Sequence, residues 1–233
     1  MKFWTITKKE LFSYFNSIMA YIVIGLFLVL TSFLFFRTFF LAGQNNMREF
    51  FGLIPYTFLF LLPAITMRSI SEENKTGTQE ILKTSSVTSF DIIFGKFLGA
   101  LMFLGIILVL SLSIPITLSY TGGLDIGIII SSYLGAFLLG ASYIAIGIFI
   151  SCFTKNQIIA FLITVVALFL LLLIGQPYIT FMLPNWLIIP FKYIGSIDHY
   201  SNLIKGVIDI KNLVYYSSII CLFNYLAIRK IDK

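Results

Sequence analysis

Six apolar runs, each about long enough to cross a lipid bilayer, occupy most of the 233 residues. A membrane-spanning helix needs about 20 mostly apolar residues. The runs are continuous rather than alternating in polarity, which favours helices over a β-barrel. The predicted spans are residues 18–41, 50–67, 97–119, 128–150, 158–175 and 213–228. The chain is therefore predicted to be an all-α integral membrane protein with six transmembrane helices.

The composition excludes a water-soluble domain. Only 11% of the residues are charged and 59% are hydrophobic, whereas a soluble domain carries roughly 25% charged residues. The net charge of +6 does not indicate a nucleic-acid partner, because the basic residues stand at the ends of apolar runs rather than on one face. We therefore expect a single membrane domain over residues 1–233.

The distribution of Lys and Arg predicts the orientation. With the amino terminus in the cytoplasm, eleven of the 16 basic residues fall on the cytoplasmic side of the predicted spans. They are Lys2, Lys8, Lys9, Arg68, Lys75, Lys83, Lys96, Lys155, Arg229, Lys230 and Lys233. Because cytoplasmic loops carry the excess of basic residues, both termini are predicted to be cytoplasmic.

The segment before the first span, residues 3–17, has an amphipathic pattern. Trp4, Leu11 and Phe15 fall near one helical face, and Lys8 lies elsewhere. This pattern predicts a helix in the cytoplasmic interface of the membrane. The alternative is a basic, aromatic flank that anchors the first span.

The predicted outer segment, residues 176–212, is too long for a simple turn. Its first part, residues 177–190, is apolar but shorter than a membrane span. Three prolines divide this part: Pro177, Pro184 and Pro190. We expect a re-entrant or interfacial element there, followed by a surface helix over residues 194–210. The last span is interrupted by polar residues and can begin earlier, near Val207.

The cytoplasmic segment 68–96 carries three patterns typical of helix starts. Residues 69–72 and 76–79 fit capping boxes, and residues 88–91 resemble a third start. The pattern predicts a short helix within residues 69–85 that lies across the cytoplasmic ends of the second and third spans. The alternative is a solvated loop whose charges only set the topology.

Within and around this segment, four runs resemble the hallmark region of ABC-2 type permeases, the membrane subunits of a class of ATP-binding-cassette exporters. They are residues 63–69 (PAITMRS), 72–82 (EENKTGTQEIL), 84–87 (TSSV) and 95–97 (GKF). In that family, acidic residues, a basic residue, Gly-Thr and Glu-Leu-Leu form a coupling helix. The family usually has proline where this chain has Ser86. The order of segments is also similar to the family across nearly the whole chain.

A narrower resemblance involves residues 141–149, 156–161 and 205–209. These runs are similar to the permeases of gliding-motility-type ABC transporters of bacteria. What that subgroup moves does not follow from these residues.

The resemblance implies a permease subunit of the bacterial inner membrane that couples ATP hydrolysis by a separate subunit to export. No phosphate-binding loop occurs in the chain, so no cofactor is expected, and ATP would be bound by the partner. The expected contacts with the ATP-binding subunit are Glu72, Glu73, Lys75, Gly77, Thr78 and Glu80. A second permease, identical or related, is implied, with the first and fifth spans as candidates for the seam. The alternative function is a membrane scaffold that recruits an ATPase to a surface or motility machinery without moving a solute.

Other functions receive less support. The one histidine, His199, stands beside Asp198, and such a neighbour pair is more often structural than catalytic. No predicted span carries the paired carboxylates of a proton relay or an intramembrane protease. Cys152 and Cys221 lack a metal-ligand spacing, and we expect them to act as small apolar residues. The protein is therefore not expected to be an enzyme or to hold a metal.

Small residues recur in the predicted span 128–150, including Gly135, Gly140 and Gly147. They suit close helix packing or, alternatively, a substrate path. An ion-coupled carrier would need broken helices and an ion site at the membrane midplane. Two prolines interrupt the second span, but no acidic residue accompanies them, so a carrier is the weakest of the transport interpretations.

Overall fold

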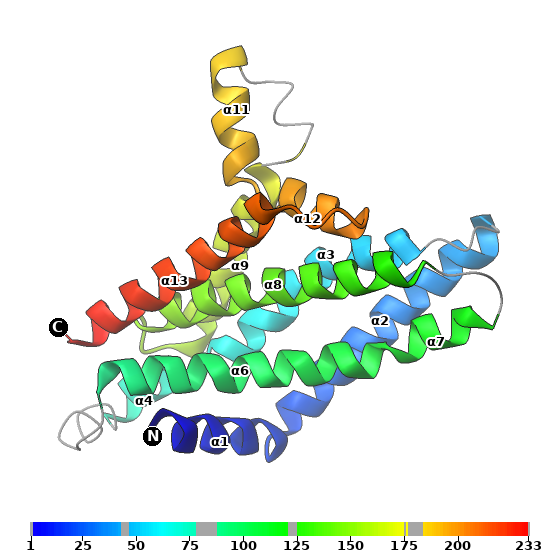
Figure 1. Ribbon diagram of the computed structural model, residues 1–233. Helices are drawn as coiled ribbons and strands as arrows, with labels where there is room; N and C mark the ends of the chain where they lie inside the picture. The colour runs from blue at the N-terminus through cyan, green and yellow to red at the C-terminus, as the bar shows by residue number, and fades with distance from the viewer. Residues whose placement is uncertain are drawn as a thin grey trace.

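The computed structural model describes residues 2–42, 47–77, 88–120, 125–174, 176 and 184–232, and within these ranges all regular structure is helical. Figure 1 shows the arrangement of the helices. In chain order they are α1 (Lys2–Phe15), α2 (Ile18–Ala42), α3 (Met47–Thr66), α4 (Ser71–Thr76), α6 (Ser89–Ser111), α7 (Ser113–Ser119), α8 (Ile126–Ser151), α9 (Gln157–Ile174), α11 (Asn185–Ile194), α12 (Ser196–Ile204) and α13 (Ile210–Asp232).

Five helical segments of the described chain are long and apolar enough to cross a membrane: α2, α3 with α4, α6 with α7, α8 and α9. They correspond to the first five predicted spans. The third begins earlier than predicted, at Ser89, because the polar residues before Phe97 are also helical. It divides at Leu112, since Pro115 has no N–H to donate to the carbonyl of Ser111 four residues earlier.

The sixth apolar run forms α13, which starts at Ile210, close to the alternative start near Val207. Its 23 residues are long enough to cross a bilayer. Polar residues such as Asn224 keep it below the hydropathy of the other five segments. The six-span arrangement therefore stays a prediction.

α8 lies at the centre of the bundle and packs against α3, α6, α9, α12 and α13 (Figure 1). Its glycines provide the space for these neighbours. A Cβ atom on Gly140 would lie 2.5 Å from the Leu104 side chain, and one on Gly147 would lie 2.2 Å from Thr66 Oγ1. The structure thus uses the small residues of this span for close helix packing.

α1 packs closely along the first half of α6. A Cβ atom on Gly95 would lie 2.8 Å from Ile6 Cβ and 2.9 Å from the Phe3 carbonyl oxygen, and one on Gly99 would lie 2.9 Å from Glu10 Cβ. The buried Thr7 hydroxyl donates a hydrogen bond of 3.2 Å to the Gly95 carbonyl. The predicted helix before the first span is therefore present and is fixed against the bundle. Its place at the membrane interface stays a prediction.

The helices after α9 differ from the predicted outer segment. Most of its first part, residues 177–183, lies outside the described residues. Pro190 is inside α11 rather than at a break, and α11 projects away from the bundle in Figure 1. α12 lies within the predicted helix over residues 194–210 and buries one face: Leu203 is buried and the Tyr200 hydroxyl donates to the Phe51 carbonyl of α3 at 2.9 Å, while Asn202 is exposed.

His199 is buried between the helices of this region. Its Nδ1 lies 2.8 Å from Asn212 Oδ1, its Nε2 lies 3.2 Å from the Tyr193 carbonyl oxygen, and its ring stacks on Tyr215. It therefore connects α11, α12 and α13. This structural role agrees with the expectation that His199 is not half of a catalytic dyad with Asp198.

The packing of α1 on α6 predicts different responses at two glycines of the same helix. Gly95→Ala should lower the free energy of unfolding by about 1–3 kcal/mol, because the added methyl group meets backbone as well as side chain. Gly105→Ala is the matched control, since nothing lies within 4 Å of its Cβ position. Thermal and denaturant unfolding in detergent would compare them. Equal stabilities of the two variants would contradict the close α1–α6 contact.

Candidate functional site

The segment between α3 and α6 contains the short helix α4, Ser71–Thr76. Of the predicted helical range 69–85, the structure describes residues 69–77, and the predicted contacts Thr78 and Glu80 lie outside the described residues. α4 ends at Gly77, whose φ of +73° is in the left-handed region that favours glycine. Gly77 therefore forms the carboxyl-terminal boundary of α4.

Two of the three predicted helix starts can be compared with the structure. The first is wrong: Ile70 is the N-cap of α4 and no side chain caps the helix, while the Ser71 hydroxyl bonds the Met67 carbonyl. The third is confirmed, because Thr88 Oγ1 accepts from the Asp91 N–H at 3.2 Å and Asp91 Oδ2 accepts from the Thr88 N–H at 3.4 Å. The second falls partly outside the described residues.

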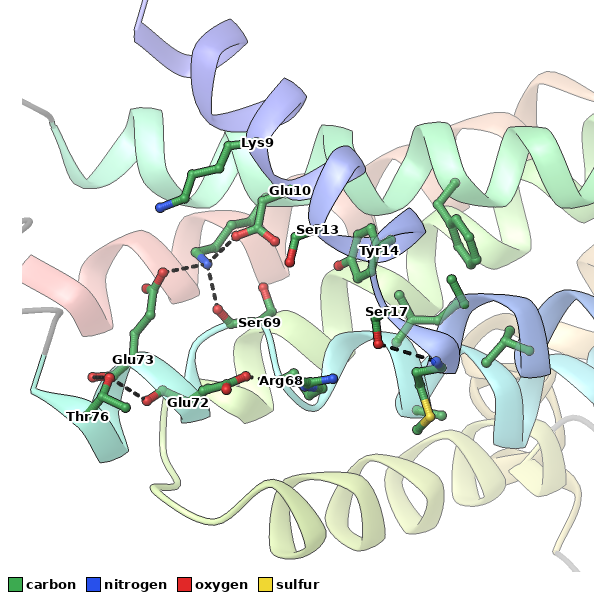
Figure 2. A pocket seen from close by; sticks show the side chains of 17 residues that line it. Lys9, Glu10, Ser13, Tyr14, Ser17, Arg68, Ser69, Glu72, Glu73 and Thr76 are labelled. Atoms are coloured by element: carbon green, nitrogen blue, oxygen red, sulfur yellow. Dashed lines mark hydrogen bonds and ion pairs between the residues drawn. The ribbon is translucent and has the colours of Figure 1, made fainter.

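A buried ammonium group ties α4 to the rest of the protein. Lys96 of α6 is only 3% exposed. Its Nζ lies 2.6 Å from Glu10 Oε1 of α1, 2.8 Å from Glu73 Oε1 of α4 and 2.6 Å from the Ser69 carbonyl oxygen. Figure 2 shows these three interactions converging on one nitrogen. We call Glu10, Ser69, Glu73 and Lys96 the Lys96 cluster.

The partners of Lys96 use its whole hydrogen-bonding capacity. A lysine ammonium has three donors, and each is directed to one of the three oxygens. Removing a charge from water is costly unless the charge is paired and hydrogen-bonded, and this arrangement meets that condition. Two carboxylates share one ammonium, so Glu10 and Glu73 retain excess negative charge and further acceptor capacity.

The opposite side of α4 contacts the turn between α8 and α9. The Asn74 side-chain amide donates to the carbonyl oxygens of Cys152 and Thr154, both at 3.4 Å. The same turn carries Phe153, whose ring lies beneath Lys230 Nζ of α13 at 4.9 Å. α4 therefore bridges the α1–α6 side of the bundle and the α8–α9 side.

Burial governs the ionisation of two groups around α4. It raises the pKa of the Cys152 thiol to about 12, so the thiol stays protonated at neutral pH and Cys152 acts as the expected small apolar residue. Burial, together with the nearby Glu10 carboxylate, also raises the pKa of the Tyr14 hydroxyl above its ordinary value. Tyr14 is therefore a neutral hydroxyl next to the Lys96 cluster.

The predicted site residues on α4 separate into two groups. Glu73 turns inward to Lys96. Glu72 stays near the surface and pairs with Arg68 at 3.2 Å, with both side chains almost half exposed. Lys75 and Gly77 are exposed. Glu72, Lys75 and Gly77 are thus accessible to a partner, whereas Glu73 holds α4 in place.

A cavity of about 540 Å³ lies beside the Lys96 cluster, between α1, α2, α3, α4 and α6 (Figure 2). Its polar wall includes Lys9, Ser13 and Arg68, and its apolar wall includes Val23 and Ile65. The change from polar to apolar lining follows the chain: Val23 and Ile65 belong to the apolar helices α2 and α3, whereas Lys9 and Ser13 belong to α1 and Arg68 follows the end of α3.

Glu10 and Lys96 were missed as site residues. Lys96 contributes to the predicted topology and to the family resemblance but was not predicted as a site residue, and Glu10 is an acidic residue in an otherwise basic segment. The helix start at Thr88 is the one sequence feature that points to Lys96 as a site residue. It places Lys96 two turns inside an apolar helix, where a buried charge needs a partner of opposite charge. The partner itself is 86 residues away.

The described residues contain no group of three or more His, Cys, Asp or Glu that could hold a metal ion. The site is a short helix with an exposed charged face. Ion pairs and hydrogen bonds connect this helix to both sides of a membrane-embedded bundle.

Comparison with known proteins identifies a family that matches this chain. The sequence model described as ABC-2 family transporter protein matches residues 42–228, which include α3, α4 and every later helix up to most of α13. A search of curated proteins found no match.

The Lys96 cluster predicts a large difference between two basic residues. Lys96→Met should destabilise the protein by about 3–5 kcal/mol, because two carboxylates lose their common cation in a buried setting. Arg68→Met, which removes a half-exposed pair, should cost less than about 1 kcal/mol. Denaturant unfolding in detergent measures both changes, and similar losses would contradict the central role of Lys96.

Proposed function

Because the chain belongs to the ABC-2 family of transporter proteins and is a membrane-spanning permease of an ABC transporter, we propose that a separate ATP-binding subunit docks on α4 and drives export through the bundle. This proposal rests on the position of α4. The helix is exposed on one face and is bonded to α1 and α6 through Lys96 and to the α8–α9 turn through Asn74.

The bonds of α4 suit the transmission of force. An ATPase dimer that closes on nucleotide must push on a rigid element joined to the spans. Displacing α4 displaces the groups bonded to it, so the α1–α6 side and the α8–α9 side of the bundle both receive the motion. The resulting change is a two-state rearrangement of packed helices, with ATP binding favouring one state.

We assign the docking contacts to Glu72, Lys75 and Gly77 and, from the resemblance, to Thr78 and Glu80. The accessibility of the first three supports this assignment. Glu73 acts differently, as a positioning residue that holds α4 on Lys96.

The proposed topology has α13 as the sixth span and both termini in the cytoplasm. The two chain ends and α4 lie toward the same end of the bundle in Figure 1, which suits one cytoplasmic face. α13 packs along α8 and α6, as a sixth member of the bundle would. The proposed location is the bacterial inner membrane.

We further propose that two permease chains, identical or related, pair through α2 and α9. These are the least covered of the five apolar segments, with 28% and 22% of their most apolar windows buried, so they have the largest surface free for lipid or a second chain. The resemblance to gliding-motility-type permeases remains a narrower proposal about the subgroup.

Vesicles containing the permease and its ATP-binding subunit test the proposed activity. Export predicts ATP-dependent movement of a labelled cargo across the vesicle membrane. Binding of the ATPase without any movement, over a panel of amphipathic cargoes, would favour the scaffold function instead.

The docking face predicts that reversing one exposed charge weakens ATPase binding. Lys75→Glu should reduce the amount of ATP-binding subunit that co-purifies in mild detergent by about tenfold, which corresponds to about 1.4 kcal/mol. Lys8→Glu on α1 is the control with the same change of charge. Undiminished co-purification of the Lys75→Glu variant would contradict docking on α4.

The left-handed backbone at Gly77 predicts a second, conformational effect. Gly77→Pro should uncouple ATP hydrolysis from transport, because proline is fixed near φ −65° and cannot end α4 in this way. Gly77→Asn should retain coupling, since asparagine tolerates the left-handed region. The ratio of ATP hydrolysed to cargo moved is the measurement, and membrane insertion should be normal in both variants. Full coupling in the proline variant would exclude a role for this boundary.

A further inference from the structure

We propose that the cavity beside the Lys96 cluster binds the headgroup of a zwitterionic phospholipid of the phosphatidylethanolamine class. The lipid would come from the leaflet on the side of α1 and α4. This inference rests on the cavity and its lining, and it does not depend on a bound ATPase.

The position of the cavity calls for an amphipathic ligand. Its polar wall is made by charged and hydroxyl side chains of α1 and of the segment from Arg68 through α4. Its apolar wall is made by Val23, Ile65 and other residues of α2, α3 and α6. A phospholipid has the same order of chemistry, with a charged headgroup next to apolar chains. A soluble metabolite would leave the apolar wall without a matching surface.

The charges of the lining indicate a headgroup with no net charge. Three basic residues line the cavity, Lys9, Arg68 and Lys96, and three acidic residues face them. The acidic residues are Glu10, Glu72 and Glu73. An anionic headgroup would balance the basic residues but lie against three carboxylates. A zwitterion can direct its phosphate to Lys9 and Arg68 and its amine to the carboxylates.

The acceptor capacity of the cluster favours an amine with N–H groups. Lys96 uses its three donors on Glu10, Glu73 and the Ser69 carbonyl, whereas each carboxylate can accept further bonds. The primary ammonium of phosphatidylethanolamine supplies three donors. The quaternary ammonium of phosphatidylcholine supplies none, so the site should distinguish the two zwitterions.

An unpaired hydroxyl in the wall also points to a bound ligand. Ser69 is 6% exposed, lines the cavity, and its Oγ has no hydrogen-bond partner in the described part of the chain. Its backbone is fixed, because the N–H donates to the Thr66 carbonyl and the carbonyl accepts from Lys96. A buried polar group without a partner is costly, and a phosphate oxygen or an ammonium would satisfy this hydroxyl. In Figure 2, Ser69 lies across from Ser13 of α1.

The size of the cavity limits what it encloses. A volume of about 540 Å³ is in the range of small-molecule sites, about 300–1,000 Å³. It accommodates a headgroup and the glycerol region, while the acyl chains leave along the apolar wall.

Native mass spectrometry of the delipidated protein can test the proposal with three lipids of identical chains: phosphatidylethanolamine, phosphatidylcholine and phosphatidylglycerol. We expect phosphatidylethanolamine to bind at least about threefold more tightly than either of the others, a difference of about 0.65 kcal/mol. Equal binding of all three lipids would mean that they bind only as annular lipid around the protein and not in the cavity. Tighter binding of phosphatidylglycerol would mean an anionic site. Either result would overturn the proposal.

Two valines of α2 provide a matched pair of variants. Val23 is buried and lines the cavity, whereas Val29 is exposed and lies outside it. Val23→Phe should fill the space and abolish the preference for phosphatidylethanolamine, and Val29→Phe should leave it unchanged. Loss of the preference in both variants, or in neither, would contradict binding in the cavity.

A second set of variants keeps the test decisive if Val23→Phe does not fold. Ser69→Ala and Lys9→Ala should each weaken phosphatidylethanolamine binding about threefold to tenfold, and Lys8→Ala, next to the cavity residue Lys9, should not. Soluble phosphoethanolamine serves as a competitor. If it displaces the lipid at equal concentration, the acyl chains contribute nothing and the site is one for the free headgroup, which would refute the lipid assignment.

Discussion

The arrangement of this protein depends on the ion pairs and the hydrogen bond made by the ammonium group of Lys96. Lys96, itself buried, joins α1, α4 and α6 through two carboxylates and one backbone carbonyl. Loss of Lys96 would leave the Glu10 and Glu73 carboxylates without their common cation, so the three helices are coupled energetically as well as in space. α4 consequently belongs to the bundle, although it is only six residues long and could not be a stable helix alone.

The opposite end of the molecule is held by neutral hydrogen bonds. The hydroxyls of Tyr200 and Tyr216 donate to backbone carbonyls of α3 and α12, and His199 links α11 to α13. Between the two ends, the central helix α8 packs through its glycines. The contiguous packed helices between α4 and the far end are the route along which the proposed displacement of α4 would travel.

The sequence predicted features whose causes are local. The cap formed by Thr88 and Asp91 involves residues three positions apart, and the apolar runs need only their own composition. It did not predict the bond from Glu10 to Lys96, because nothing in either neighbourhood specifies a partner 86 residues away. For the same reason it did not predict that the Tyr200 hydroxyl of α12 bonds a carbonyl of α3, 149 residues away. Glu73 was identified as a site residue, but its inward direction depends on Lys96.

The central claim is that α4 moves as one body with the groups it bonds. Distances between spin labels test it, with labels at Lys75→Cys on α4 and Lys155→Cys beside the α8–α9 turn, in a chain whose native Cys152 and Cys221 are replaced by alanine. The account predicts one narrow distance that is the same in the nucleotide-free and ATP-bound complexes. A distance that broadens or shifts by several ångströms on ATP binding would contradict it.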